Sequence, residues 1–188
     1  MAPAPRRPLL ALCAALAVLP GAAAAGSGSA LVIIDMTVEQ VANVSYRRSE
    51  IVETIRRLTK EGNFSAVIDS HLWFPYLEES SLSRMFPDLA RPGTEGAALI
   101  PELRDLGARF VQKLQFSSFH DSALEAYLRG AGVGKLYLTG INTDYCVFAT
   151  ALDAFYRQIP VQVVEDGVSS FHGREGHERG KAMLRSFP

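Results

Sequence analysis

The stretch 135-KLYLTGINTDYCVFATA-151 joins a strand pattern directly to a helix pattern. Lys135–Thr139 is a short run of mostly apolar and β-branched residues, which is typical of a buried strand. Gly140 follows, and apolar side chains then recur at helical spacing at positions 147, 148, 151, 152 and 155. We expect this helix to begin near Asp144, which places Cys146 in its first turn. A strand that leads into a helix is the repeating unit of an α/β fold.

The same alternation extends in both directions from this unit. Its members are the expected strands 30–34, 65–68, 109–112 and 161–164 and the expected helices 51–58, 97–106, 124–128 and 175–185. Strand and helix in alternation predict a parallel sheet covered on both faces, with right-handed crossovers. We therefore predict one α/β domain over residues 30–188, with three layers and a mostly parallel, Rossmann-like sheet of five or six strands. Residues 71–94 contain three prolines and no clear period, and loops of this length are usually functional.

Composition excludes several classes of protein. The chain has 188 residues, of which 48% are hydrophobic, and 19 Lys and Arg stand against 20 Asp and Glu. The apolar content excludes disorder for most of the chain, and the absence of a basic run gives no basis for nucleic-acid binding. Two cysteines are too few for a disulfide-rich scaffold or a cysteine-based zinc finger.

Residues 1–25 have the pattern of a signal peptide. Arg6 and Arg7 precede a short apolar run at 9–19, and small residues follow at 22–25. The run is too short to span a membrane, so we expect a secreted or periplasmic protein without a membrane segment after cleavage. An organelle transit peptide is the alternative, because the segment is rich in Arg and Ala and lacks acids. Cleavage removes Cys13 and leaves Cys146 as the only cysteine.

Chemically reactive side chains end several of the expected strands. Asp35, Asp69 and Lys113 each follow a strand, and Cys146 begins the helix after the fourth one. Ligands of parallel sheets bind beyond the carboxyl ends of the strands, so these groups should lie together. A helix N-terminus and the Lys113 ammonium would both favour a thiolate at Cys146, and Asp35 would accept its proton. The residues alone equally allow a buried structural cysteine and a structural Asp35–Lys113 ion pair.

A family resemblance favours the catalytic interpretation. Residues 140–151 closely resemble the nucleophile segment of the isochorismatase-like cysteine hydrolases, which include the nicotinamidases, and the segments 30–36, 113–119 and 164–168 resemble three others. The resemblance implies the isochorismatase-type fold and a triad of Asp35, Lys113 and Cys146. It also implies a cis peptide before Asn142, with the N–H groups of Asn142 and Cys146 forming an oxyanion hole.

The implied activity is hydrolysis of a small-molecule amide through a thioester, releasing ammonia or an amine, without an organic cofactor. Two alternatives stay open. One is an isochorismatase-type vinyl-ether hydrolase that uses Asp35 as the acid. The other is an inactive binding protein of the same fold, because Met36–Gln40 replaces the Gln-Asn-Asp-Phe that usually follows the nicotinamidase aspartate. Family members are often homo-oligomers, although no surface pattern in the sequence requires an oligomer.

A metal site is implied by the same resemblance. Asp69-Ser-His71 resembles the metal-binding segment of nicotinamidases, where a divalent ion binds a ring nitrogen of the substrate. The further histidine of that family is absent, and Asp88 stands nearest its position. We therefore expect Asp69, His71 and Asp88 to hold one zinc, iron or manganese ion. The alternative is that Asp69 and His71 form only hydrogen bonds to the loop.

Aromatic residues are the remaining candidates for substrate binding. Trp73 and Phe86, in the long loop, either build an aromatic wall for the substrate or pack the loop onto the sheet. Tyr145 precedes the nucleophile and is expected to line the pocket. His172 and His177 lie on a polar segment near a helix start, so we expect them to be solvated.

Overall fold

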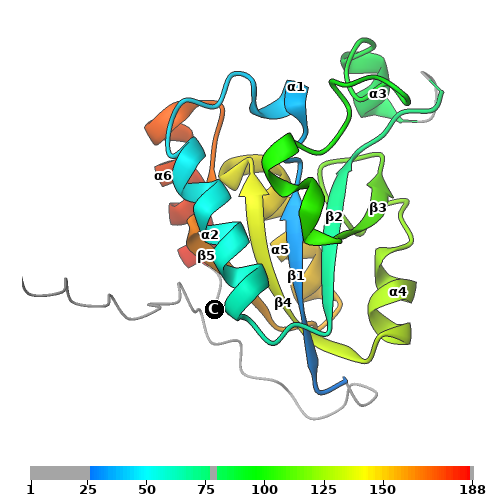
Figure 1. Cartoon of the computed structure of the whole chain (residues 1–188), viewed down its shortest axis with the longest axis vertical. Coiled ribbons are helices and arrows are strands. Elements are labelled where there is room, and N and C mark those ends of the chain that lie inside the picture. Colours follow the sequence, from blue (N-terminus) through cyan, green and yellow to red (C-terminus); the bar gives the residue numbers. More distant parts are fainter. Residues whose placement is uncertain (1–25, 77–79, 187–188) are drawn as a thin grey trace, which may run out of the picture.

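The structure is a computed structural model that describes residues 26–76 and 80–186. The predicted signal peptide lies outside the described residues. Five parallel strands form one sheet in the order β3-β2-β1-β4-β5 (Figure 1). They are β1 (Gly28–Ile34), β2 (Ala66–Leu72), β3 (Arg109–Lys113), β4 (Val133–Ile141) and β5 (Val161–Ser169). The fold class predicted from the sequence is confirmed, with five strands rather than six and with every strand parallel.

Helices cover both faces of the sheet (Figure 1). The helical elements are α1 (Val38–Val41), α2 (Arg48–Glu61), α3 (Ser81–Met85), the 3₁₀ helix η1 (Pro101–Leu106), α4 (Leu124–Gly130), the π-helical turn η2 (Thr143–Val147), α5 (Phe148–Tyr156) and α6 (Gly173–Arg185). One apolar core joins the sheet to α1, α2 and η1, and the other joins it to α4, α5 and α6. None of the helices in the described residues is long and apolar enough to cross a membrane.

The prediction of a helix over residues 97–106 is wrong for the first half of that range. Only Pro101–Leu106 is helical, because the residues before it use their backbone groups elsewhere. Ala98 O accepts from Val38 N at 3.0 Å, and Ile100 N donates to Met36 O at 2.9 Å. Proline has no N–H group to continue a helix from upstream but is well suited to begin one.

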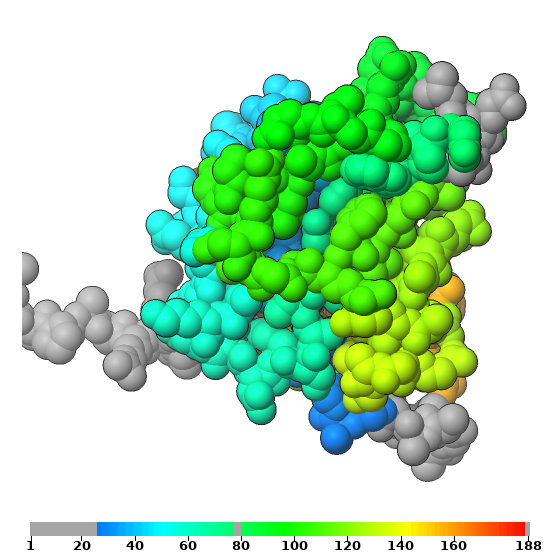
Figure 2. Space-filling view, turned by 45° about the vertical axis from the view of Figure 1, so that its right-hand side comes forward, coloured from blue at the N-terminus to red at the C-terminus, as the bar shows by residue number. Residues whose placement is uncertain are grey.

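The residues from 73 to 100 form a long connection at the carboxyl end of the sheet. The region expected to be an irregular loop contains one short helix, α3, whose N-terminus is capped by the Ser80 side chain. Figure 2 shows the green part of the chain spread over the upper part of this face, with some blue N-terminal residues visible through a gap in it and others at the bottom of the view. This connection therefore covers part of the sheet edge at which the reactive side chains lie.

The strand order places a topological switch between β1 and β4. From β1 the chain proceeds to β2 and β3 on one side, and β4 and β5 occupy the other side. Gly140 allows the two strands to approach closely, since its φ is +101° and a Cβ there would lie 2.0 Å from Ile34 O. Ligands of open parallel sheets bind at such a switch point. Asp35 follows β1 and Cys146 follows β4, so both lie at this position.

Candidate active site

The Asp35, Lys113 and Cys146 side chains meet at the switch point. Lys113 Nζ lies 2.8 Å from Asp35 Oδ2 and 3.4 Å from Cys146 Sγ. Asp35 and Lys113 have no exposed surface, and Cys146 is only 3% exposed. The ammonium also donates toward the carbonyl oxygens of Gln115 and Phe116, at 3.1 and 3.2 Å. The ammonium is therefore held between the acid and the thiol by one ion pair, with Asp35, and by three hydrogen-bond acceptors.

Asp35 is held in place through its backbone and its side chain. Its φ of +54° is in the left-handed region, which aspartate tolerates better than most residues. Its N–H donates to Ser70 O, and its Oδ1 accepts from Leu72 N, both at 3.1 Å. The carboxylate is thus anchored to the neighbouring strand β2, with its other oxygen directed at Lys113.

Burial dominates the electrostatics of the thiol. Burial, followed by the negative charge of Asp35, raises the pKa of Cys146 to about 12, and the nearby Lys113 charge offsets this only in part. Burial alone would lower the pKa of Lys113, but Asp35 and Cys146 outweigh it and raise that pKa above 10.5. The Lys113 charge, which was expected to favour the thiolate, is therefore outweighed by burial and by Asp35. The thiol is protonated in the free protein and needs a base when it attacks.

The turn that carries Cys146 is a π-helical turn rather than the first turn of an α-helix. The peptide bond between Ile141 and Asn142 is cis, as the family resemblance implied. Asn142 O accepts from the N–H groups of Tyr145 and Val147, both at 3.1 Å, and Asn142 Oδ1 accepts from Phe171 N at 2.8 Å. Asn142 thereby ties together the two ends of the turn and the chain after β5.

Helix α6 supports this turn from behind. Two glycines one helical turn apart bring it close: a Cβ at Gly180 would lie 2.5 Å from the carbonyl carbon of Thr143, and one at Gly176 would lie 3.0 Å from Asp144 Oδ2. The Asp144 carboxylate, only 1% exposed, accepts from Ser170 Oγ at 2.8 Å and pairs with Arg179. The nucleophile turn is therefore fixed by side chains as well as by its backbone.

The predicted solvation of His177 is wrong. The residue is fully buried on α6, where its Nδ1 lies 3.0 Å from Thr143 Oγ1 and its Nε2 lies 3.4 Å from the Arg47 guanidinium. Burial and then the charges of Arg47 and Lys181 lower the pKa of His177 below 6.5. The imidazole is thus neutral at neutral pH and forms part of the support for the turn. His172, by contrast, is 39% exposed, and its ring contacts Tyr145 and Phe171.

The three expected metal ligands do not come together. His71 Nδ1 lies 2.8 Å from Asp69 Oδ1, and both side chains are buried, but the Asp88 side chain is 91% exposed and pairs with Arg91. Within the described residues, no group of three or more His, Cys, Asp and Glu side chains is arranged to hold a metal ion. Of the atoms of these side chains, only His71 Nε2 is buried and unpartnered. One ligand atom does not make a metal site, which needs about three protein ligands, so these residues do not fit one.

Aromatic side chains gather around Tyr145, the residue before the nucleophile, but they are mostly not the predicted ones. Tyr145 lies with its ring nearly parallel to that of Phe171, with centroids 6.2 Å apart, and 5.5 Å from that of Phe116. All three are about two-fifths exposed or more. Trp73 instead packs edge-on against Phe110, and Phe86 is 46% exposed at the end of α3. Sequence reasoning missed Phe116 and Phe171, although each follows the end of a strand.

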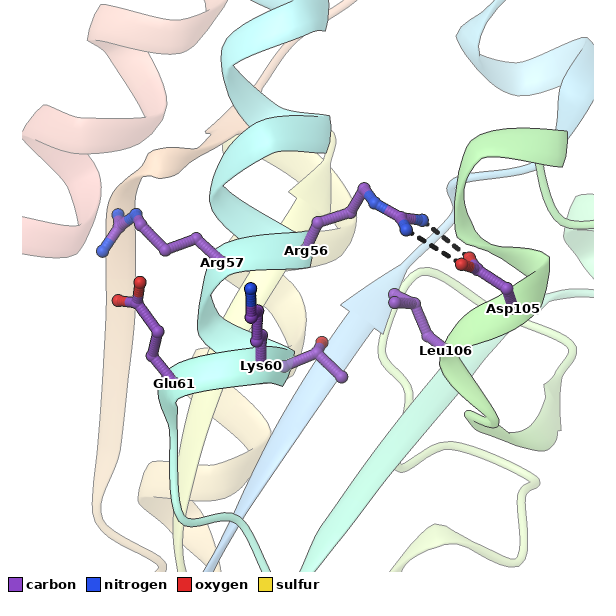
Figure 3. A pocket seen from close by; sticks show the side chains of 7 residues that line it. Arg56, Arg57, Lys60, Glu61, Asp105 and Leu106 are labelled. Carbon is purple, nitrogen blue, oxygen red and sulfur yellow. Dashed lines mark hydrogen bonds and ion pairs between the residues drawn. The ribbon is translucent and has the colours of Figure 1, made fainter.

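A surface pocket on α2 lies away from this site. It is lined by residues near the end of α2 and by η1, and Arg56 pairs with both carboxylate oxygens of Asp105 across it (Figure 3). Because α2 runs antiparallel to the strands, its last turn lies at the amino end of the sheet, opposite the triad. The pocket is therefore not part of the candidate active site.

The fold and the buried cysteine site together define an α/β protein equipped for nucleophilic chemistry at a topological switch point. The sequence matches the Isochorismatase domain family over residues 29–187. The chain therefore belongs to the isochorismatase family, whose members include hydrolases.

Known proteins of this family are similar over different lengths. The isochorismatase family protein PncA of Bacillus subtilis is 34% identical over 140 residues, which cover 68% of this chain and 75% of that protein. The crystal structure of the nicotinamidase PncA from Bacillus subtilis superimposes with a TM-score of 0.73 at 25% identity, over 85% of this chain and 95% of that one. The ureidoacrylate amidohydrolase RutB of Variovorax paradoxus is 36% identical over 88 residues, covering 46% of this chain and only 32% of that protein.

Proposed function

We propose that this protein is a cysteine amidohydrolase that cleaves a small-molecule amide. The observation that carries the proposal is the contact of one buried ammonium, on Lys113, with both the Asp35 carboxylate and the Cys146 sulfur. Two of the similar proteins are named as amidases, a nicotinamidase and a ureidoacrylate amidohydrolase, which supports an amide as the substrate class.

In the proposed mechanism, Asp35 takes the proton of the Cys146 thiol as the sulfur attacks the amide carbonyl carbon. A base is needed because the thiol pKa is raised to about 12. The C–N bond then breaks, and Asp35 returns the proton to the departing nitrogen, which leaves as ammonia or an amine. Water attacks the resulting thioester, the acid product leaves, and the thiol is restored.

The neighbouring groups have supporting roles in this scheme. Lys113 stabilises the negative charge as it passes from the carboxylate to the sulfur, because it contacts both. The N–H groups of Asn142 and Cys146 are proposed to stabilise the tetrahedral oxyanion. Tyr145, together with Phe116 and Phe171, is proposed to contact the substrate next to the nucleophile, while Trp73 and Phe86 remain candidates in the long connection.

Ammonia release from a panel of small amides tests the proposal. The panel includes nicotinamide, simple carboxamides and ureido compounds. We expect turnover of at least one member, and we expect Cys146→Ala to abolish it while an intact mass spectrum of the wild type shows a transient acyl adduct. Folded, monodisperse protein that turns over no amide on the panel, with a thiol that forms no adduct, would contradict the assignment.

A vinyl-ether hydrolase is the second candidate. It is favoured by the protonated state of the thiol, since such an enzyme would use the buried Asp35 as its acid and would not need a reactive sulfur. The same Cys146→Ala variant separates the two candidates. Full retention of vinyl-ether hydrolysis in this variant would establish the second candidate, and loss of amide hydrolysis would establish the first.

We also propose that residues 1–25 direct export of the protein. The sequence pattern of a charged start, an apolar run and small residues supports this. Expression of the full chain in a secreting host should yield a mature protein that begins at residue 25 or 26, as read by N-terminal sequencing. Retention of the intact N-terminus on a protein found inside the cell would contradict it.

A further inference from the structure

Unpartnered polar atoms collect at the carboxyl ends of β1 and β2. Among the described residues, the buried side-chain atoms without a hydrogen-bond partner are Asp35 Oδ2, Ser70 Oγ and His71 Nε2. The charge of the Lys113 ammonium, 2.8 Å away, compensates Asp35 Oδ2, but nothing compensates the other two. Ser70 and His71 are consecutive residues of β2, so their side chains point to opposite faces of the sheet. Folded proteins leave few such atoms, so the unpartnered His71 Nε2 points to a bound molecule that satisfies it.

The hydrogen bond to Asp69 defines what His71 offers to a ligand. Because Asp69 Oδ1 is an acceptor 2.8 Å from Nδ1, the ring N–H is assigned to Nδ1, which leaves the unpartnered Nε2 as the acceptor of the ring. The imidazole is only 4% exposed and packs with its centroid 4.6 Å from that of Phe110. The ring orientation is therefore fixed, and Nε2 is a preorganised hydrogen-bond acceptor.

His71 lies directly beside the triad. In the parallel register, Ile34 pairs with Ser70, so His71 is opposite Asp35. Asp35 contacts the residues on both sides of His71, since its N–H donates to Ser70 O and its Oδ1 accepts from Leu72 N. Neighbouring strands are about 4.8 Å apart, so the backbones of Asp35 and His71 are close enough for one small molecule to reach both residues.

We propose that His71 Nε2 binds an N–H or O–H group of the substrate. The substrate class is then a small amide with a second hydrogen-bond donor a few bonds from the scissile carbonyl, such as a ureido or hydroxyl group or a pyrrole-type N–H. A substrate that instead has an acceptor nitrogen at this position, such as a pyridine nitrogen, would place two lone pairs opposite each other and should bind less well. This inference rests on the proposed amidase function, and it gives the Asp69–His71 pair a role that needs no metal ion.

A matched pair of ring carboxamides tests the inference. Pyrrole-3-carboxamide carries an N–H donor, and nicotinamide carries a lone-pair nitrogen on a ring of similar size. We expect the wild type to prefer the pyrrole by about tenfold or more in kcat/KM, the effect of about one hydrogen bond. We expect His71→Phe to remove this preference by raising KM for the pyrrole, and His71→Gln, which keeps an acceptor, to restore part of it.

A control and a metal measurement complete the test. His120→Phe replaces an exposed histidine outside the site and should leave the preference unchanged. Purified active protein should contain no stoichiometric metal by elemental analysis and should keep its activity in a chelator. A preference for nicotinamide, or activity that is lost with chelator and restored by one equivalent of metal, would overturn the inference.

Binding separates this inference from the proposed function. The Cys146→Ala variant keeps the subsite but cannot form a thioester, so calorimetric binding of pyrrole-3-carboxamide to it should still depend on His71. Binding that depends on His71 without turnover in the wild type would reject the amidase function and keep the subsite. Turnover with no dependence on His71 would do the reverse.

Discussion

The two connections that flank the triad are built in opposite ways. The turn after β4 is short, its Thr143 and Asp144 side chains are buried, and α6 packs against it through two glycines. The connection after β2 runs for almost thirty residues, includes exposed side chains such as Tyr76 and Phe86, and is joined to α1 through contacts such as the Ala90 N–H to Glu39 bond. The first is held by packed secondary structure, and the second is long and carries exposed side chains.

This difference separates chemistry from recognition. A nucleophile must be placed to within a fraction of an ångström, so its support is best provided by packed secondary structure. Substrate choice changes among relatives through loops, which tolerate substitutions and insertions. The loss of the expected third metal ligand on the β2 side, beside an intact triad, is consistent with this division.

The largest expected effect concerns the acid. Asp35→Asn should lower kcat for amide hydrolysis by about a thousandfold, because the base that accepts the thiol proton is removed. Asp88→Asn, which changes an exposed carboxylate on the β2 side, is the matched control. Near-normal activity in Asp35→Asn would show that the Asp35 carboxylate is not the catalytic base.

Substitutions of Asp35 and Lys113 should change the reactivity of the Cys146 thiol in opposite directions. Asp35 raises and Lys113 lowers the pKa of Cys146, so Asp35→Asn should speed alkylation by iodoacetamide at a given pH and Lys113→Met should slow it. In the wild type the rate should still be rising at pH 10, because the pKa is about 12. A rate that is already constant above pH 7 would contradict this electrostatic description.

A pair of glycine substitutions compares the rigidity of the two sides. Gly180→Ala places a methyl group 2.5 Å from the Thr143 backbone and should destabilise the fold by about 3 kcal/mol, or about 6–12 °C in Tm. Gly93→Ala, in the β2 connection, meets no atom within 4 Å and pays only for its φ of +77°, about 1 kcal/mol. If both variants lowered Tm equally, the turn after β4 would be no more tightly packed than the connection after β2.

A smaller effect should appear in the pH dependence of stability. The folded-state pKa of His177 is lowered from 6.5, so the unfolded chain binds its proton first as the pH falls. The stabilisation from the neutral ring is therefore present above about pH 6.5 and is lost below it. Thermal melts at pH 7.5 and 5.5 should differ by a few degrees less in His177→Gln than in the wild type. An identical slope in both would show that His177 does not contribute.

The smallest effect is expected at Asp88. Its ion pair with Arg91 is exposed, and such pairs contribute little, so Asp88→Ala should change stability by less than about 0.5 kcal/mol. Activity and metal content should also stay unchanged. A loss of bound metal or of activity in Asp88→Ala would restore Asp88 to the site and contradict its placement at the surface.

Much of the fold could be predicted from the sequence, because buried parallel strands are near-continuous apolar runs and their ends are marked by polar residues. That rule also indicated Asp35, Lys113 and Cys146. It could not predict the thiol pKa, which depends on how completely three separate strands bury the sulfur. It missed His177 because the buried face of α6 consists of Gly176, His177, Gly180, Lys181 and Leu184 and is therefore not apolar. The spacing of the two glycines was the available signal of close packing.

The docking of α6 has a consequence for the order in which the protein matures. The helix that supports the Cys146 turn follows all five strands in the chain, so a molecule in which the sheet has formed before α6 docks would lack the final support. Such a molecule contains every reactive side chain and yet should be unable to hydrolyse its substrate. Activity would then begin only when α6 has docked against the turn.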